Sequence, residues 1–333
     1  MTPDVSGGPY HPRMEITPAQ RRTLEQLIGL GSTPDLASDL DERFRRSLEH
    51  RLAAAGIPPG AGETIWLGKH RLNDRQRCEG LFQAGLLREG PPFEHTHVTA
   101  SGRLFHKAIE LDVATERAFD PFSVCERAAG RAAEQDGSFG KHWSALDHFD
   151  QADLLADASR HLALFRDSFP PLQRRWAPQS ELFMKVALAH GRIVLSGALD
   201  LVLGRRRRLA IDFKSGRAWP EHAEDMRFYA LLLLLRTGVP PYRVATFFLD
   251  SGEWQAEDVS EQTLDRAAER VVAAARTVVE LSAVRAPDLT PGPYCARCPR
   301  RALCPAAGGR VAPASTGPVA DSQAAEEAVV TAG

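Results

Sequence analysis

The chain has 333 residues, of which 43% are hydrophobic and 25% are charged, a composition typical of soluble globular proteins. Its net charge of −2 argues against non-specific coating of nucleic acid, which depends on excess positive charge, although a local basic groove stays compatible with binding. No apolar run approaches membrane-spanning length, and the N-terminus lacks the features of a signal peptide. We therefore expect a cytoplasmic protein without a membrane partner.

Apolar residues at three- and four-residue spacing predict helices throughout the first half of the chain. The predicted helices span residues 18–30, 36–55, 73–87, 99–113, 121–134 and 147–169. Residues 1–15 and 306–333 are rich in Gly, Pro, Ala, Ser and Thr, which predicts two disordered tails. We expect residues 16–64 to form an N-terminal helical accessory region.

The second half of the chain begins with the shorter hydrophobic runs that are typical of strands. Three such runs with turns between them predict a meander, and a helix, two more strands and a long helix follow it. The strands are predicted at 181–189, 193–203, 209–214, 242–250 and 254–259, and the helices at 220–237 and 261–281. A small mixed sheet inside a helical shell indicates an α/β or α+β fold.

Two acidic residues and a lysine lie at the ends of two neighbouring predicted strands. They are Asp200 and, in the next strand, Asp212 and Lys214. Because side chains alternate along a strand, Asp212 and Lys214 share a face while Phe213 points back into the core. Carboxylates bind a hard divalent cation that acidifies a water, and a nearby lysine orients that water or offsets negative charge. Hydrolysis of a phosphodiester bond needs this combination.

Three of the five cysteines are clustered in the sequence as Cys295-x₂-Cys298-x₅-Cys304. Thiolates at this spacing can reach one metal centre but leave one corner of a tetrahedron open, and Cys78 is the candidate far upstream. Four thiolates suit a [4Fe–4S] cluster, with zinc as the chemical competitor. Cys125 fits no ligand spacing and is expected to be a buried helix residue.

Asp200 and Asp212-x-Lys214 resemble the two acidic positions and the lysine of the PD-(D/E)XK nuclease superfamily. Cys78 and the three C-terminal cysteines resemble the iron–sulfur nucleases of its RecB-type group, which includes the CRISPR-associated exonucleases. The resemblance covers about residues 65–305. It implies a restriction-endonuclease-like core with a C-terminal metal-cluster segment, and it favours iron–sulfur over zinc.

The same resemblance implies a metal ligand upstream of the sheet. The RecB-type group has a Gly-x-x-x-His helix there, which Gly102 and His106 match. In the group this histidine joins the two acids on the metal, so His106, Asp200 and Asp212 are the expected ligands of Mg²⁺ or Mn²⁺, together with the backbone carbonyl of Phe213.

A second signature of the group, Gln-x-x-x-Tyr, falls on the helix after the lysine strand. Here the two positions are Asp225 and Tyr229, so the tyrosine is present and the glutamine is replaced. An ionised aspartate only accepts hydrogen bonds, whereas glutamine also donates, so a DNA contact is in doubt at Asp225, which could instead add a carboxylate near the site. Tyr229 is an expected site residue, against the alternative of a helix core residue, and Glu181 is a possible additional acid.

The resemblance implies a metal-dependent DNA nuclease, exonuclease-like, acting on single strands or DNA ends in repair, recombination or CRISPR-type processing. A catalytically weak DNA-end-binding or assembly module is the alternative, and a zinc-stapled regulator is a third interpretation. No phosphate-binding loop of the helicase type occurs, so unwinding would need a separate helicase or nuclease-complex subunit. Arginines 205–208 form either part of a DNA-binding groove or a solvated turn.

Overall fold

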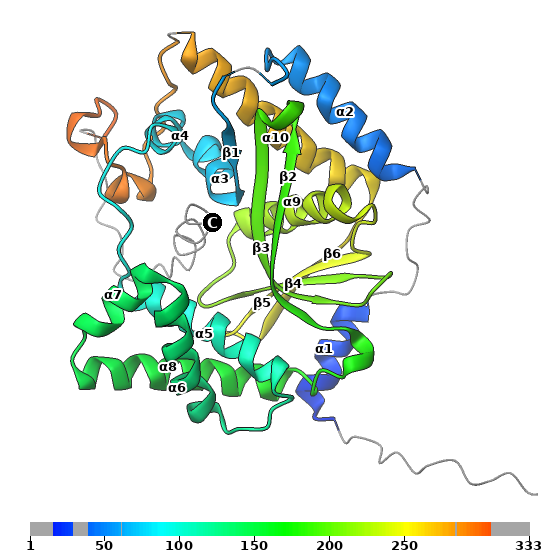
Figure 1. Cartoon of the computed structure of the whole chain (residues 1–333), viewed down its shortest axis with the longest axis vertical. Coiled ribbons are helices and arrows are strands. Elements are labelled where there is room, and N and C mark those ends of the chain that lie inside the picture. Colours follow the sequence, from blue (N-terminus) through cyan, green and yellow to red (C-terminus); the bar gives the residue numbers. More distant parts are fainter. Residues whose placement is uncertain (1–15, 29–38, 61, 284, 308–333) are drawn as a thin grey trace, which may run out of the picture.

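The computed structural model describes residues 16–28, 39–60, 62–283 and 285–307. Within these residues six strands form one mixed sheet (Figure 1). The strands are β1 (Ile65–Leu67), β2 (Gln179–Leu188), β3 (Ile193–Leu203), β4 (Leu209–Lys214), β5 (Arg243–Phe248) and β6 (Glu253–Asp258). Their order is β1-β3-β4-β5-β6, with β2 paired to β3. The β1–β3 and β4–β5 pairs are parallel and the others antiparallel.

The long strand β3 creates a fork in the sheet. Strand β2 pairs along one edge of β3, from Ile193 to Val202. Strands β1 and β4 must therefore share its other edge, where β1 pairs with residues 193–195 and β4 with residues 201–203. Residues 196–200 of β3 lie between these two partners, and the functional side chains gather around that gap.

Helices cover both faces of the sheet (Figure 1). They are α1 (Pro18–Ile28), α2 (Leu40–Ala54), α3 (Lys69–Arg77), α4 (Glu79–Leu86), α5 (His97–Ala114), α6 (Pro121–Gln135), α7 (Gly137–Ala145), α8 (His148–Ser168), α9 (Pro220–Thr237) and α10 (Glu261–Ser282). Short 3₁₀ turns occur at η1 (Arg174–Trp176), η2 (Ala189–Gly191), η3 (Pro293–Arg297) and η4 (Arg301–Leu303). One core lies under α2, α9 and α10, and a second lies under α5, α6 and α8.

Alternation along β4 divides its side chains between these two cores. Leu209, Ile211 and Phe213 enter the core on the α5 side, whereas Ala210 enters the core on the α9 side. Phe213 is fully buried, as predicted, and its ring contacts Phe105 of α5 edge-on at 6.3 Å between centroids. The same alternation turns Asp212 away from the α5 side.

The expected small mixed sheet wrapped by helices is confirmed, and several predicted elements agree with the structure residue for residue: 193–203, 209–214 and 220–237. Helix α9 begins with a proline and ends at Gly238, whose φ of 77° and N–H bond to Leu234 form the predicted cap. No helix among the described residues is long and apolar enough to cross a membrane.

Three elements differ from the sequence prediction. The helix expected at 73–87 is interrupted at Cys78, whose φ of −164° and ψ of 125° are extended and separate α3 from α4. Strand β1 was not predicted, because three residues are too few for alternation to be recognised. Helix α7 was also missed, since glycines weaken its helical pattern; Asp136 caps it by accepting the N–H groups of Ser138 and Phe139.

The N-terminal helices pack onto the two cores. Leu40, Phe44, Leu48 and Leu52 of α2 are buried in the core that also contains α9 and α10, and Leu27 of α1 is buried in the other. The domain boundary expected at residue 64 stays a prediction. The tail predicted at 1–15 and nearly all of the tail predicted at 306–333 lie outside the described residues.

Candidate metal centre and active-site groove

A histidine and two acids from three elements converge beside the fork in the sheet. Glu181 of β2 lies opposite Asp200 of β3, because the pairs on either side of them hold the register. His106 of α5 brings its Nδ1 to 3.2 Å from Asp200 Oδ1 and 4.0 Å from Glu181 Oε1. One ligand atom from each residue lies within 4.8 Å of the other two, which is close enough for one ion.

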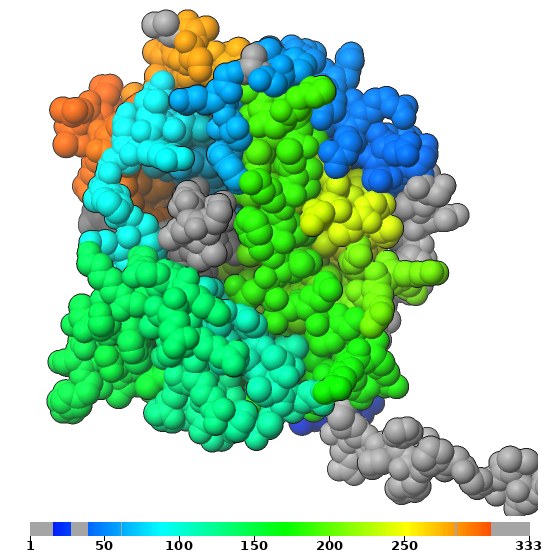
Figure 2. Space-filling view, in the orientation of Figure 1, coloured from blue at the N-terminus to red at the C-terminus, as the bar shows by residue number. Residues whose placement is uncertain are grey.

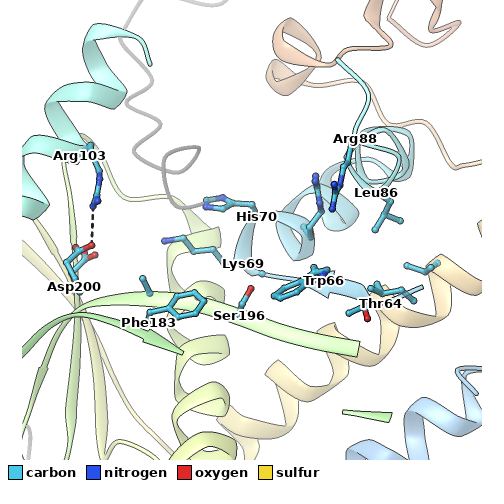
Figure 3. Close-up of a pocket in the computed structure, with 18 of the residues that line it drawn as sticks. Thr64, Trp66, Lys69, His70, Leu86, Arg88, Arg103, Phe183, Ser196 and Asp200 are labelled. Carbon is cyan, nitrogen blue, oxygen red and sulfur yellow. Dashed lines mark hydrogen bonds and ion pairs between the residues drawn. The ribbon is translucent and has the colours of Figure 1, made fainter. Parts of the chain in front are cut away.

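Two local features of this trio concern the backbone of Glu181 and an ion pair of its side chain. Glu181 has a φ of 51°, an uncommon conformation for a residue other than glycine, and such strain is typical of functional positions. Arg103, one turn before His106 on α5, binds Glu181 with Nη1 3.3 Å from Oε2. Figure 3 shows Arg103 and Asp200 together at one end of the groove.

Asp212 and Lys214 lie beside the trio at the end of β4. Asp212 Oδ2 is 2.7 Å from Lys214 Nζ, and Asp212 Oδ1 is 4.0 Å from Lys69 Nζ. The backbone N–H of Phe213 donates to Asp200 Oδ2 at 2.6 Å, which ties the two acidic strands together. All four charged side chains are buried in this pocket of compensating charge.

The backbone carbonyl of Phe213 faces the same gap. In a strand the N–H and C=O of one residue point to the same edge. Since the Phe213 N–H reaches Asp200 while the Lys214 carbonyl accepts from Leu249 on the opposite edge, the Phe213 carbonyl is directed toward β3. Its predicted role as a metal ligand stays a prediction.

The structure brings together two of the three side chains predicted to bind the metal, His106 and Asp200. The third member of the close group is Glu181 rather than Asp212. Asp212 lies on the face of β4 away from the α5 side, and its carboxylate contacts two lysines instead. Its role as a metal ligand stays a prediction.

Lys69 is one candidate-site residue that the sequence did not single out. It lies in the first turn of α3, is only 3% exposed, and places its ammonium 5.3 Å from the ring centroid of Tyr229. Tyr229 is fully buried on α9, and Gly197 of β3 makes room for its ring. Tyr229 therefore lies beneath the site and supports Lys69. No spacing in the sequence connects Lys69 to the other site residues.

Asp225 belongs to a buried polar network one turn before Tyr229. Asn73 Nδ2 donates to Asp225 Oδ1 at 3.0 Å, and Arg270 donates to Asn73 Oδ1 at 2.7 Å. Burial raises the pKa of Asp225 above its ordinary value, although Lys69 and other cations oppose the shift. Asp225 occupies the position of the family's glutamine, and the side-chain amide next to it comes from Asn73 of α3.

His222, at the start of α9, is a second residue that the sequence did not single out. Burial, and then the nearby Lys214, lower the pKa of His222 to about 4. Its Nδ1 accepts the N–H of Trp219 at 3.3 Å. The imidazole is therefore neutral at pH 7 and leaves Lys214 as the cation at this point of the site.

The trio and Lys214 open into a cavity of about 1410 Å³. Its lining contains seven lysines and arginines against four acids, so a chain of net negative charge carries a locally basic groove. The cations are Lys69, Arg71, Arg88, Arg103, Lys107, Arg192 and Lys214. Arginines 205–208 do not line this cavity; Arg207 instead stacks over Tyr242, and Arg208 bonds Thr237.

The four predicted cluster cysteines line one separate cavity of about 480 Å³. The C-terminal segment reaches Cys78 through backbone and side-chain bonds: Tyr294 donates to the Arg77 carbonyl at 2.7 Å, and the Glu79 N–H donates to Asp288. No three of these sulfurs lie within 4.8 Å of one another in the described part of the chain. Cys125 is buried on α6, as predicted, and burial raises its pKa to about 12.

The fold and this site agree with a match to a family model over residues 69–305, and the chain belongs to the PD-(D/E)XK nuclease superfamily. Its mixed sheet and helical layers are those of a restriction-endonuclease-like fold. The match covers strands β2 to β6 of the sheet, the metal-ligand candidates and the cysteine segment. It leaves α1, α2 and β1 outside.

Two solved structures are similar to the chain at low identity. One is a "Putative exonuclease" from Eubacterium rectale, 11% identical, with 84% of this chain and 94% of that chain covered and a TM-score of 0.43. The other is SSO0001, 13% identical, with 80% and 96% covered and a TM-score of 0.32. A search of curated proteins found no match.

Proposed function

We propose that this member of the superfamily is a divalent-metal-dependent deoxyribonuclease with exonuclease-like action on single strands or DNA ends. The observation that carries the proposal is the convergence of His106, Glu181 and Asp200 beside the paired Asp212 and Lys214. Carboxylates are the ligands that Mg²⁺ prefers, and an imidazole is acceptable to Mn²⁺, so the donor set fits either ion. Such an ion would polarise a phosphate oxygen and lower the pKa of a bound water.

The side chains around the ion have separate tasks in this proposal. Lys214 orients the attacking water and offsets the negative charge that develops on the phosphate. Asp212 holds the Lys214 ammonium at 2.7 Å and so fixes its direction. The Phe213 N–H holds one oxygen of Asp200 and leaves the other toward His106. Tyr229 acts through Lys69 as a positioning residue.

A catalytically weak DNA-end-binding module is the competing function. Against it stands the cost of burying four charged side chains at one strand end, which their mutual pairing partly offsets. A fold kept only for binding does not require that arrangement.

The nuclease proposal is tested with purified protein, Mn²⁺ and end-labelled single-stranded DNA. We expect Lys214→Met to lower the cleavage rate at least about 100-fold, the scale of a positioned catalytic group. Lys141→Met is the control, because Lys141 is exposed on α7 outside the cavity. Equal rates for Lys214→Met and the parent would contradict the assignment, provided that both unfold at the same temperature.

We further propose that Cys78, Cys295, Cys298 and Cys304 bind a [4Fe–4S] cluster that joins α3 and α4 to the C-terminal segment. The support is that all four line one cavity. Four thiolates suit a four-iron cluster, with a Cys₄ zinc site as the chemical competitor. The resemblance to the iron–sulfur nucleases favours the four-iron cluster.

The cluster proposal is tested by metal analysis of anaerobically purified protein. Iron and sulfide with a broad visible absorbance are expected, and Cys298→Ser should lose both. Cys125→Ala should keep them, because Cys125 lies in a different core. Stoichiometric zinc without iron would reject the iron–sulfur centre while leaving the four ligands in place.

The pathway and partners are also proposals. Repair, recombination or CRISPR-type processing would use such an activity, with a separate helicase or nuclease-complex subunit opening duplex DNA. We also propose a cytoplasmic location, with which the lack of a disulfide among the five cysteines, all of them described, is consistent.

A further inference from the structure

We propose that β1, β2 and β3 form a stacking floor for single-stranded DNA, on which Phe183 and Trp66 hold bases of the strand whose phosphate lies at the metal centre. This inference rests on the proposed nuclease function and adds the residues that select a single strand. The stacking floor is defined by Phe183, Lys185 and Trp66, with Ala198 and Ser196 between them.

The register places this floor on the same face as the metal ligands. Phe183 lies directly opposite Ala198, two residues along β2 from Glu181. Side chains two apart in a strand share a face, so the Phe183 ring begins about 7 Å from Glu181 along the strand. Figure 3 shows Phe183 between Asp200 at one end of the groove and Trp66 toward the other.

Trp66 continues the floor on the neighbouring strand. Trp66 pairs with Val194 of β3. Val194 is six residues before Asp200, so the two residues lie about 20 Å apart along the strand. Lys185, opposite Ser196, holds its ammonium 4.5 Å from the centroid of the Trp66 ring. Aromatic and cationic groups thus alternate away from the metal centre, in a spacing suited to bases and phosphates.

Phe183 is exposed although β2 buries side chains on its other face. It is 48% exposed, whereas Met184 and Val186, which point the other way, are core residues. The small Ala198 opposite it leaves the ring uncovered on that side. The surface of β2 and β3 lies open on the face seen in Figure 2, between the part containing α2 and the lobe of α6–α8.

The charges of the cavity fit a polyanion on this floor. Arg71, Arg88 and Arg192 line the same cavity and lie on elements other than those carrying the aromatic rings. Aromatic platforms in a basic groove bind single strands with little sequence preference, because every base has a face to stack. In duplex DNA those faces are covered by neighbouring base pairs, so the floor would discriminate against duplex.

The test measures binding and cleavage with the full chain. Binding of a fluorescent single-stranded oligonucleotide and of its duplex is measured with Ca²⁺, and cleavage of both with Mn²⁺. We expect Phe183→Ala to weaken single-strand binding at least about five-fold, as for loss of one stacked base, and to leave duplex binding unchanged. Phe183→Tyr should restore the parent affinity, since the ring is kept.

Two further measurements separate stacking from a structural effect. Phe183→Ala should leave the dependence of affinity on salt unchanged, because no charge is removed, whereas Arg192→Ala should reduce that slope. Phe149→Ala is the matched control: Phe149 is 70% exposed on α8 and does not line the cavity.

The two hypotheses fail in different ways. A parent protein that cleaves DNA, with Phe183→Ala binding single strands as tightly as the parent, overturns the stacking floor and leaves the nuclease proposal intact. A parent that cleaves no DNA, while single-strand binding still depends on Phe183, overturns the proposed nuclease and leaves the floor as a binding surface. Equal weakening of single-strand and duplex binding by Phe183→Ala also overturns the floor.

Discussion

The replacement of Glu181 by glutamine tests the metal centre most directly. Glu181→Gln keeps the size of the side chain and removes the charge that lies 4.0 Å from His106 Nδ1. It also deprives Arg103, 3.3 Å away, of one of its two anionic partners, leaving Asp136 at 3.5 Å, and so makes the surroundings of the ion more positive. Both effects lower the affinity for a divalent cation.

The magnitude follows from the position of the carboxylate. Loss of an outer-shell partner of a metal ligand costs about 10- to 100-fold in metal affinity, and loss of a direct ligand should cost at least as much. The Glu181 side chain is 24% exposed, so water can replace part of what is lost. We therefore expect the affinity for Mn²⁺ to fall about 10- to 100-fold, the range found for an outer-shell partner.

Calorimetric titration of Mn²⁺ into DNA-free protein measures this change without relying on activity. Glu110→Gln is the matched control, because Glu110 lines the same cavity with a 31% exposed side chain but pairs with Lys107 outside the trio. The Mn²⁺ concentration for half-maximal cleavage should shift in parallel for Glu181→Gln. If Glu181→Gln binds Mn²⁺ as tightly as Glu110→Gln, then Glu181 is not a ligand and the trio is only an ion-pair cluster.

Two further predictions concern the support beneath the site. Gly197→Ala would place a Cβ 2.7 Å from Tyr229 Cε1. We expect this overpacking to lower the free energy of unfolding by about 1–3 kcal/mol, measured as a lower urea midpoint. An unchanged midpoint would show that the Tyr229 ring moves freely. Burial raises the pKa of Asp225 in the folded protein above its unfolded value of about 3.8. The contribution of the protonated Asp225 carboxyl to stability is therefore present below the unfolded pKa and is lost as pH rises through the higher folded pKa. Asp225→Asn, which can still accept from Asn73, should therefore gain stability relative to the parent as pH rises through that window, and a gain independent of pH would contradict this sign.

The agreement between sequence and structure is closest where one local pattern decides. Strand β3, strand β4 and helix α9 have the predicted bounds because hydrophobic runs, turn glycines and the Gly238 cap act within a few residues. The resemblance to the superfamily, which the family-model match confirms, was also predicted from residues at local spacing, such as Asp212-x-Lys214.

The composition of the site depended on contacts between distant segments. Lys69 reaches Asp212 from a helix that begins 143 residues earlier in the chain, as the two residue numbers show, and no pattern in α3 indicates that destination. Glu181 joins His106 because β2 pairs with β3 in one register and α5 crosses above them. The break of the helix at Cys78 similarly follows from its contact with the C-terminal segment.

The sequence by itself determined the superfamily and five of the six strands in chain order, and it predicted most of the side chains proposed for the site, because those depend on residue type and short-range periodicity. Only the tertiary structure decided which of them meet. Strand register and helix packing decide which side chains meet when they are more than a hundred residues apart, because the entropy of closing such long loops differs little from one pair to another. That selection grouped Glu181 with His106 and Asp200, and it directed Asp212 toward Lys69 and Lys214.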